Sequence, residues 1–148
     1  GHALFLESSL TGKGPRVYAD NPGMARYLQR SIETLLWKDF ANESLAVVPA
    51  EFSRSGGSLI TMQERIVTRD EEIVLAWWDL MKPFILTMPP GAMNRPLGVY
   101  STFIPARSAQ LSVNGRAATA AVFPMERFGK PASSCCLAWS ESWTRPRG

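Results

Sequence analysis

The chain has 148 residues, of which 45% are apolar and 20% are charged, and its formal net charge is +3 at pH 7. This composition is close to the globular average, which excludes a disordered, collagen-like or disulfide-stapled chain. No apolar stretch approaches the ~20 residues that a membrane-spanning helix needs. We therefore expect one globular domain, residues 1–148, with no membrane span and a cytoplasmic location.

The chain begins with Gly1-His2 and lacks an initiator methionine, which is typical of the remnant of a cleaved expression tag. A signal peptide that was removed earlier is compatible with the same start. The sequence contains one histidine, His2, so the natural domain would then have none. Ser-His-Asp catalysis, Cys-His catalysis and histidine-ligated metal sites all need an imidazole, and the sequence argues against all three.

Basic residues are scattered along the chain, whereas nucleic-acid binding usually needs a clustered basic patch. No glycine-rich motif of the P-loop or Rossmann type occurs. The two cysteines, Cys135 and Cys136, cannot assemble a zinc site by themselves. We interpret them as small buried apolar residues, with a redox-active pair as the alternative. We expect no nucleic-acid partner, no cofactor and no metal.

The N-terminal part predicts a short strand over residues 4–10, a turn, and a second extended segment over residues 16–19. A helix follows, because Asn21 can cap it and Pro22 suits its first position. Apolar residues then recur at helical spacing on one face up to about Trp37, namely Met24, Leu28, Ile32, Leu35 and Leu36.

After Asn42 the hydrophobic period changes to two, which is typical of strands. Asn114-Gly115 is a strong signal for a type I′ hairpin turn, and residues 88–96 are too rich in proline for a strand. The pattern predicts strands over residues 45–54, 58–67, 72–81, 84–88, 97–104, 109–113, 116–123 and 134–143. Eight or nine strands and one N-terminal helix indicate an α+β fold, predominantly antiparallel β, built as a strongly curved sheet or small β-barrel that hides its edges.

Alternation along these strands places Glu64, Asp79 and Glu141 on faces that they share with apolar residues. Burial among apolar groups raises the pKa of a carboxyl unless a cation or a donor holds it, and a raised pKa suits a general acid or base near neutral pH. We therefore name these three acids as candidate catalytic residues. The alternative is that they pair with arginines or lie in water at strand ends.

The chain is rich in aromatic residues that can line a cavity or simply fill a core. The leading hypothesis is that it binds a hydrophobic or aromatic small molecule in a barrel-like cavity, with Glu64, Glu141 or an arginine fixing the polar end of the ligand. In its number of elements this plan resembles lipocalin-type and fatty-acid-binding-protein barrels. The candidate ligand-binding residues are Met62, Trp77, Tyr100, Trp139 and Trp143.

Two alternatives remain open. One is a histidine-free isomerase, cyclase, hydratase or lyase that uses a buried carboxylate as its general acid or base. The other is an accessory or oligomerisation domain, because residues 72–81 are apolar on both strand faces and one face can pack on a partner such as a second copy of the chain.

Overall fold

The computed structural model describes residues 1–31, 38–57 and 60–144. These residues form twelve strands, one α-helix and two short 3-10 helices, and nearly all strand pairs are antiparallel. The expectation of a predominantly antiparallel β fold with one helix is confirmed, whereas the count of eight or nine strands, the strongly curved sheet and the closed barrel are not. The chain divides into two compact units, the first being Gly1–Ser55, Gln63–Ala76 and Gln110–Thr119, and the second Gly56–Met62, Trp77–Ala109 and Ala120–Gly148.

The first unit contains a three-stranded sheet. Strand β1 (Ala3–Leu6) pairs antiparallel with β2 (Arg16–Ala19), and β2 pairs in parallel with β3 (Val47–Pro49). Strand β1 is shorter than predicted because Ser8 caps a 3-10 helix, η1 (Ser9–Thr11), that follows it. The single strand predicted over residues 45–54 is wrong, since it divides after Pro49 into β3 and β4 (Glu51–Gly56).

Helix α1 (Pro22–Ser31) begins as predicted, because the Asn21 side chain accepts a hydrogen bond from the Met24 amide at 3.0 Å. Its buried positions are Ala25 and Gln29, whereas Met24 and Leu28 of the predicted apolar stripe are half-buried. Gln29 tolerates burial because its amide nitrogen donates to the Phe40 carbonyl at 2.8 Å. The rest of the stripe and the predicted helix end near Trp37 lie outside the described residues.

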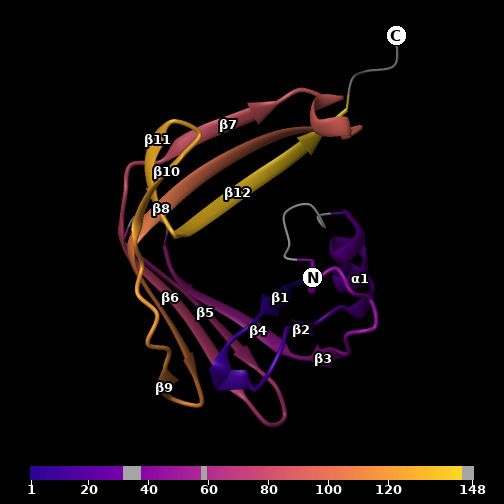
Figure 1. Ribbon diagram of the computed structural model, residues 1–148, viewed down its shortest axis with the longest axis vertical. Helices are drawn as coiled ribbons and strands as arrows, with labels where there is room; N and C mark the ends of the chain where they lie inside the picture. Colours follow the sequence, from indigo (N-terminus) through magenta and orange to yellow (C-terminus); the bar gives the residue numbers. More distant parts are fainter. Residues whose placement is uncertain (32–37, 58–59, 145–148) are drawn as a thin grey trace. The chain divides into compact units, whose positions relative to one another are not determined.

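A seven-stranded sheet has the order β12-β8-β6-β5-β4, and β7 and β9 also pair with β8 (Figure 1). Strand β8 joins two segments that were predicted as separate strands. The first predicted strand ends before Pro105, because proline has no amide proton to donate to a neighbouring strand. The strand nevertheless continues through Pro105, whose carbonyl accepts a hydrogen bond from the Met81 amide at 2.8 Å. The bounds are β5 (Thr61–Val67), β6 (Glu72–Leu80), β7 (Phe84–Met88), β8 (Gly98–Val113), β9 (Arg116–Ala117) and β12 (Cys135–Trp143). Residues 58–59, where we expected a strand to begin, lie outside the described residues.

The Asn114-Gly115 hairpin is confirmed. Both residues have positive φ, +49° and +78°, and Val113 pairs with Arg116 across the turn. The strand predicted over residues 116–123 is wrong beyond Ala117, because this alanine-rich segment has little β-propensity.

The sequence pattern does not predict a second hairpin. Strands β10 (Pro124–Arg127) and β11 (Lys130–Ser133) pair antiparallel around Phe128 and Gly129, whose φ angles are +51° and +69°. Each strand contains a proline, Pro124 or Pro131, and proline is confined to edge strands and strand starts. The segment therefore lacks the sequence pattern by which strands are predicted.

The core of the first unit surrounds Tyr18, which is completely buried together with Ile66 and Ile73. The Tyr18 hydroxyl donates to Glu71 Oε2 at 2.9 Å, and Arg16 donates to Glu71 Oε1 at 3.1 Å. Burial, aided by this hydrogen bond to Glu71, raises the pKa of Tyr18 above its ordinary value.

Candidate functional site

An aromatic surface is formed in the second unit where β8 lies between β7 and β12 (Figure 1). Directly opposite residues of antiparallel strands project from the same face of a sheet. Tyr100 lies opposite Glu141, and Thr102 lies opposite both Ile85 and Trp139. Trp143 lies opposite Gly98, two residues further along the same face. We call this surface the aromatic face and define it as Ile85, Tyr100, Trp139, Glu141 and Trp143.

The apolar residues of the aromatic face are exposed to an unusual degree for their type. The exposed fractions are 58% for Ile85, 41% for Tyr100, 40% for Trp139 and 42% for Trp143. Within the described part of the chain, the rings of Tyr100, Trp139 and Trp143 contact no other aromatic ring. A contiguous exposed apolar patch marks a binding surface more often than an ordinary protein exterior does.

The opposite face of the same three strands carries a separate set of aromatic and hydroxyl contacts. Phe84 stacks on Phe103 with ring centroids 5.4 Å apart, and Phe128 contacts Phe103 at 5.9 Å. Ser101 is buried, and its hydroxyl is hydrogen-bonded to that of Ser140 at 2.7 Å. The strand register places Phe84, Phe103 and Ser101 on the face opposite to the aromatic face, because neighbouring residues of a strand project to opposite sides.

Glu141 is exposed, which corrects the expectation that it lies on a sheltered face. Alternation placed it correctly with Trp139 and Trp143, but that face is open. Glu141 forms no ion pair with any residue that the structure describes. It therefore contributes an uncompensated negative charge in the middle of an aromatic surface.

The other two candidate acids are paired with arginines, as the alternative interpretation allowed. The Glu64 side chain is 17% exposed and its carboxylate is bonded to Arg54. Asp79 lies 3.4 Å from Arg107 and is exposed, so it too is not on a sheltered face. In residues 1–31, 38–57 and 60–144, no three histidine, cysteine or acidic side chains group closely enough to hold a metal ion.

Three of the five candidate ligand-binding residues lie together in the structure, and the other two lie elsewhere. Tyr100, Trp139 and Trp143 come together on the aromatic face. Met62, only 5% exposed, is a core residue of β5, and Trp77 is half-buried in β6. Ile85 was not among the candidates named from the sequence. Its position in the predicted strand over residues 84–88 was the one feature that could have indicated a place on this sheet.

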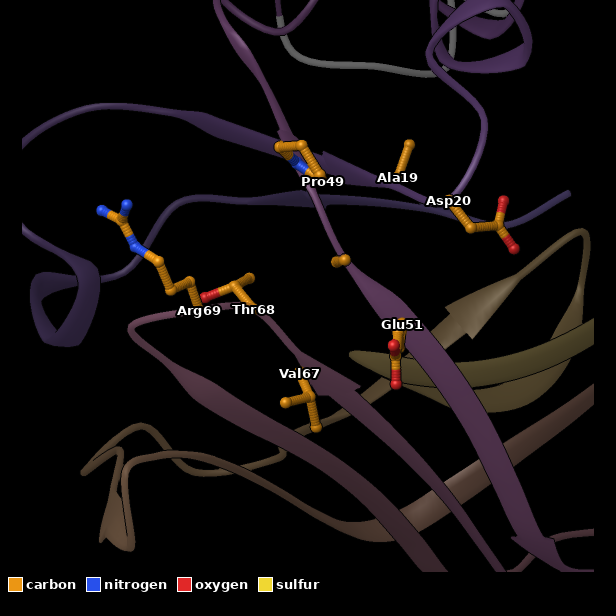
Figure 2. Close-up of a pocket in the computed structure, with 8 residues that line it drawn as sticks. Ala19, Asp20, Pro49, Glu51, Val67, Thr68 and Arg69 are labelled. Carbon is orange, nitrogen blue, oxygen red and sulfur yellow. The ribbon is translucent and has the colours of Figure 1, made fainter.

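A groove of about 570 Å³ lies in the first unit, and Figure 2 shows its lining. The Asp20 carboxylate and the Arg69 guanidinium point in opposite directions in this view. Asp20 accepts hydrogen bonds from the His2 amide and imidazole, both at 2.7 Å, and these bonds lower its pKa. Arg69 pairs with Asp70 at 3.2 Å. Because its polar groups do not converge on one point, we place the functional site on the aromatic face instead.

Comparison of the chain with known protein families, with curated proteins and with solved structures found no match. No helix among the described residues has the length and apolar character needed to cross a membrane.

Proposed function

We propose that the chain binds a hydrophobic or aromatic small molecule, and that this molecule stacks on the aromatic face. The observation that supports the proposal is the exposure of Tyr100, Trp139 and Trp143 together on one face of the sheet. Aromatic rings offer a large contact area on rigid side chains, and a well-placed ring pair adds about 0.5–1.5 kcal/mol beyond the area that it buries. A ligand with a flat apolar body uses this arrangement best.

The charge on Glu141 indicates which flat molecules are favoured. Its carboxylate is flanked on β12 by Trp139 and Trp143 and lies opposite Tyr100. Carboxylates attract cations, and the faces of tryptophan and tyrosine rings do so as well. The preferred ligand therefore carries a positive charge, such as an ammonium or amidinium group, on an aromatic or apolar body.

Binding on the aromatic face does not require the barrel-like cavity that was expected from the sequence. An open face supplies stacking and charge complementarity by itself, and enclosure would add further apolar burial. The histidine-free enzyme stays a prediction without a supporting observation, because Glu64 and Asp79 are paired with arginines and Glu141 is exposed.

Isothermal titration calorimetry tests the proposal with three probes, 2-naphthylmethylammonium, the neutral 2-naphthylmethanol and methylammonium. We expect the first to bind at least about tenfold more tightly than the other two, which lack either the charge or the aromatic body. Trp139→Ala and Tyr100→Ala should weaken its binding by about tenfold each. Tyr27→Ala removes an exposed tyrosine from helix α1 in the first unit and is the matched control.

The charge is tested by Glu141→Gln, with Glu126→Gln as the control because Glu126 is an exposed acid on β10. Glu141→Gln should remove the preference for the ammonium probe and leave the binding of naphthylmethanol unchanged. Equal binding by the Trp139→Ala and Tyr27→Ala proteins would overturn the proposed site. Native mass spectrometry that shows a dimer abolished by Trp139→Ala would instead support the oligomerisation alternative.

A further inference from the structure

Two hollows in the second unit share the lining residues Met81 and Arg107. The larger has a volume of about 400 Å³ and is also lined by Lys82, Pro83, Phe84, Lys130 and Pro131. The smaller has a volume of about 200 Å³ and is also lined by Val122, Phe123, Pro124, Ala132 and Ser133. None of these residues belongs to the aromatic face.

The larger hollow carries an excess of positive charge. Lys82, Arg107 and Lys130 all line it. Arg107 Nη1 lies 3.4 Å from Asp79 Oδ1, which is a long contact between two exposed side chains. Neither Lys82 nor Lys130 forms an ion pair with a residue in the described ranges. Arg107 therefore has one carboxylate partner and the two lysines have none among the described residues, so a guest anion would compensate their charge.

The smaller hollow is apolar. Val122, Phe123 and Pro124 form one part of its wall, and the buried Ala132 forms another. The hydroxyl of Ser133 already donates a hydrogen bond within the protein, to the Ala106 carbonyl. Apart from Arg107, which it shares with the larger hollow, this hollow is therefore lined mainly by apolar side chains.

We propose that these hollows form a second binding site, independent of the aromatic face, for a small amphiphilic anion. Its acidic group occupies the larger hollow beside Arg107, Lys82 and Lys130, and its apolar chain occupies the smaller hollow. Arginine suits this role because its planar guanidinium binds a carboxylate or a phosphate through two parallel hydrogen bonds. Even without the smaller hollow, the volume of the larger hollow lies within the roughly 300–1,000 Å³ that is typical of small-molecule sites.

A carboxylate and a phosphate monoester share the chemistry that this site recognises. Calorimetric titration with octanoate and with octyl phosphate distinguishes the two sources. Two matched probes test each half of the site, since 1-octanol has the chain without the charge and acetate has the charge without the chain. We expect octanoate or octyl phosphate to bind at least about tenfold more tightly than 1-octanol and acetate. Added salt should weaken the binding, because the contact is electrostatic.

The charge contacts are tested by Arg107→Gln and by the double variant Lys82→Gln/Lys130→Gln. Each should weaken the binding of the amphiphile by about tenfold. Lys13→Gln is the control for the lysine substitutions, because it removes a positive charge from an exposed lysine of the first unit. Lys82 and Lys130 are exposed, so the double variant should fold normally and keeps the test decisive if Arg107→Gln does not fold.

The apolar half is tested by Phe123→Ser, which should weaken octanoate binding and leave acetate binding unchanged. Trp139→Ala should leave octanoate binding unchanged, which separates this site from the aromatic face. Equal binding of 1-octanol and octanoate would overturn the proposal. A loss of affinity in Lys13→Gln as large as that in the Lys82→Gln/Lys130→Gln protein would also overturn it, since the attraction would then be due to net charge alone.

Discussion

The indole of Trp143 lies against the main chain of Gly98, its directly opposite residue on β8. A Cβ atom built on Gly98 would lie 2.4 Å from Trp143 Cε2 and 2.7 Å from Trp143 Nε1. No side chain fits in that space while the indole keeps its place. The absence of a side chain at Gly98 therefore positions one ring of the aromatic face.

Gly98→Ala should consequently displace the Trp143 indole and weaken binding of the naphthylmethylammonium probe by several-fold. The fold should tolerate the change, because Trp143 is 42% exposed and close to the end of β12, so its ring can move outward. Gly57→Ala is the control, since a Cβ on Gly57 has no neighbour within 4 Å. Calorimetry and urea unfolding measure the two effects separately. Equal affinity in the two alanine variants would show that the position of the indole is unimportant.

The buried tyrosine predicts how stability depends on alkaline pH. The pKa of Tyr18 is raised above 10.0 in the folded protein, so the unfolded chain loses this proton first as the pH increases. Above pH 10 the folded state then binds more protons than the unfolded state, and the free energy of unfolding falls as the pH rises. The stabilisation from Tyr18 is complete below the unfolded pKa and is lost as the pH passes through the folded pKa.

Tyr18→Phe should remove this decline, although it lowers stability at neutral pH because Glu71 loses a hydrogen-bond donor. Urea unfolding at several pH values between 8 and about 11 measures the slope. Tyr27→Phe is the control, since Tyr27 is 62% exposed and its replacement should leave the slope as it is in the unsubstituted protein. An unchanged slope in Tyr18→Phe would mean that other groups cause the alkaline decline.

The buried hydroxyl of Ser133 joins β11 to the strands beside it. It donates to the Ala106 carbonyl and accepts from the Cys135 amide at 3.2 Å. Ser133→Ala leaves both backbone groups without this partner, which should cost about 1–3 kcal/mol of unfolding free energy. Ser142→Ala removes an exposed hydroxyl from β12 and should change stability by less than about 0.5 kcal/mol. Urea denaturation compares the two, and equal midpoints would refute a structural role for Ser133.

Local signals in the sequence were reliable where a short segment determines its own conformation. Asn114-Gly115 formed the expected turn, and Asn21 caps its helix. Alternation on β12 also grouped Trp139 with Glu141 correctly. What alternation cannot reveal is which face of a strand is covered, because coverage depends on elements that are distant in the sequence. For that reason the acid expected in a sheltered cavity lies on an open surface.

The second binding site was not predictable from local pattern at all. Its cations come from the loop before β7, from β8 and from β11, which are far apart along the chain. The hairpin that contributes Lys130 was itself missed, because Pro124 and Pro131 interrupt the strand pattern. A site assembled from separate elements becomes visible only when the pairing of those elements is known.

The two adjacent cysteines yield a last prediction, which separates an inert pair from a redox-active one. Cys135 lies opposite Ala106 and Cys136 opposite Pro105, so neighbouring thiols project from opposite faces of β12. Burial raises the pKa of both thiols above 9.0, and each side chain is half-buried. At pH 8 the reactive thiolate fraction is therefore smaller in the folded protein than in the unfolded chain.

Alkylation by iodoacetamide at pH 8, followed by mass spectrometry, should be several-fold slower in native buffer than in concentrated urea. The single variants Cys135→Ser and Cys136→Ser assign the rate to each thiol. Folded protein that alkylates as fast as unfolded chain, or that forms a Cys135–Cys136 bond under mild oxidation, would favour the redox-active alternative. Slow alkylation of both thiols would identify them as packing residues, because a thiol that stays protonated is a poor nucleophile.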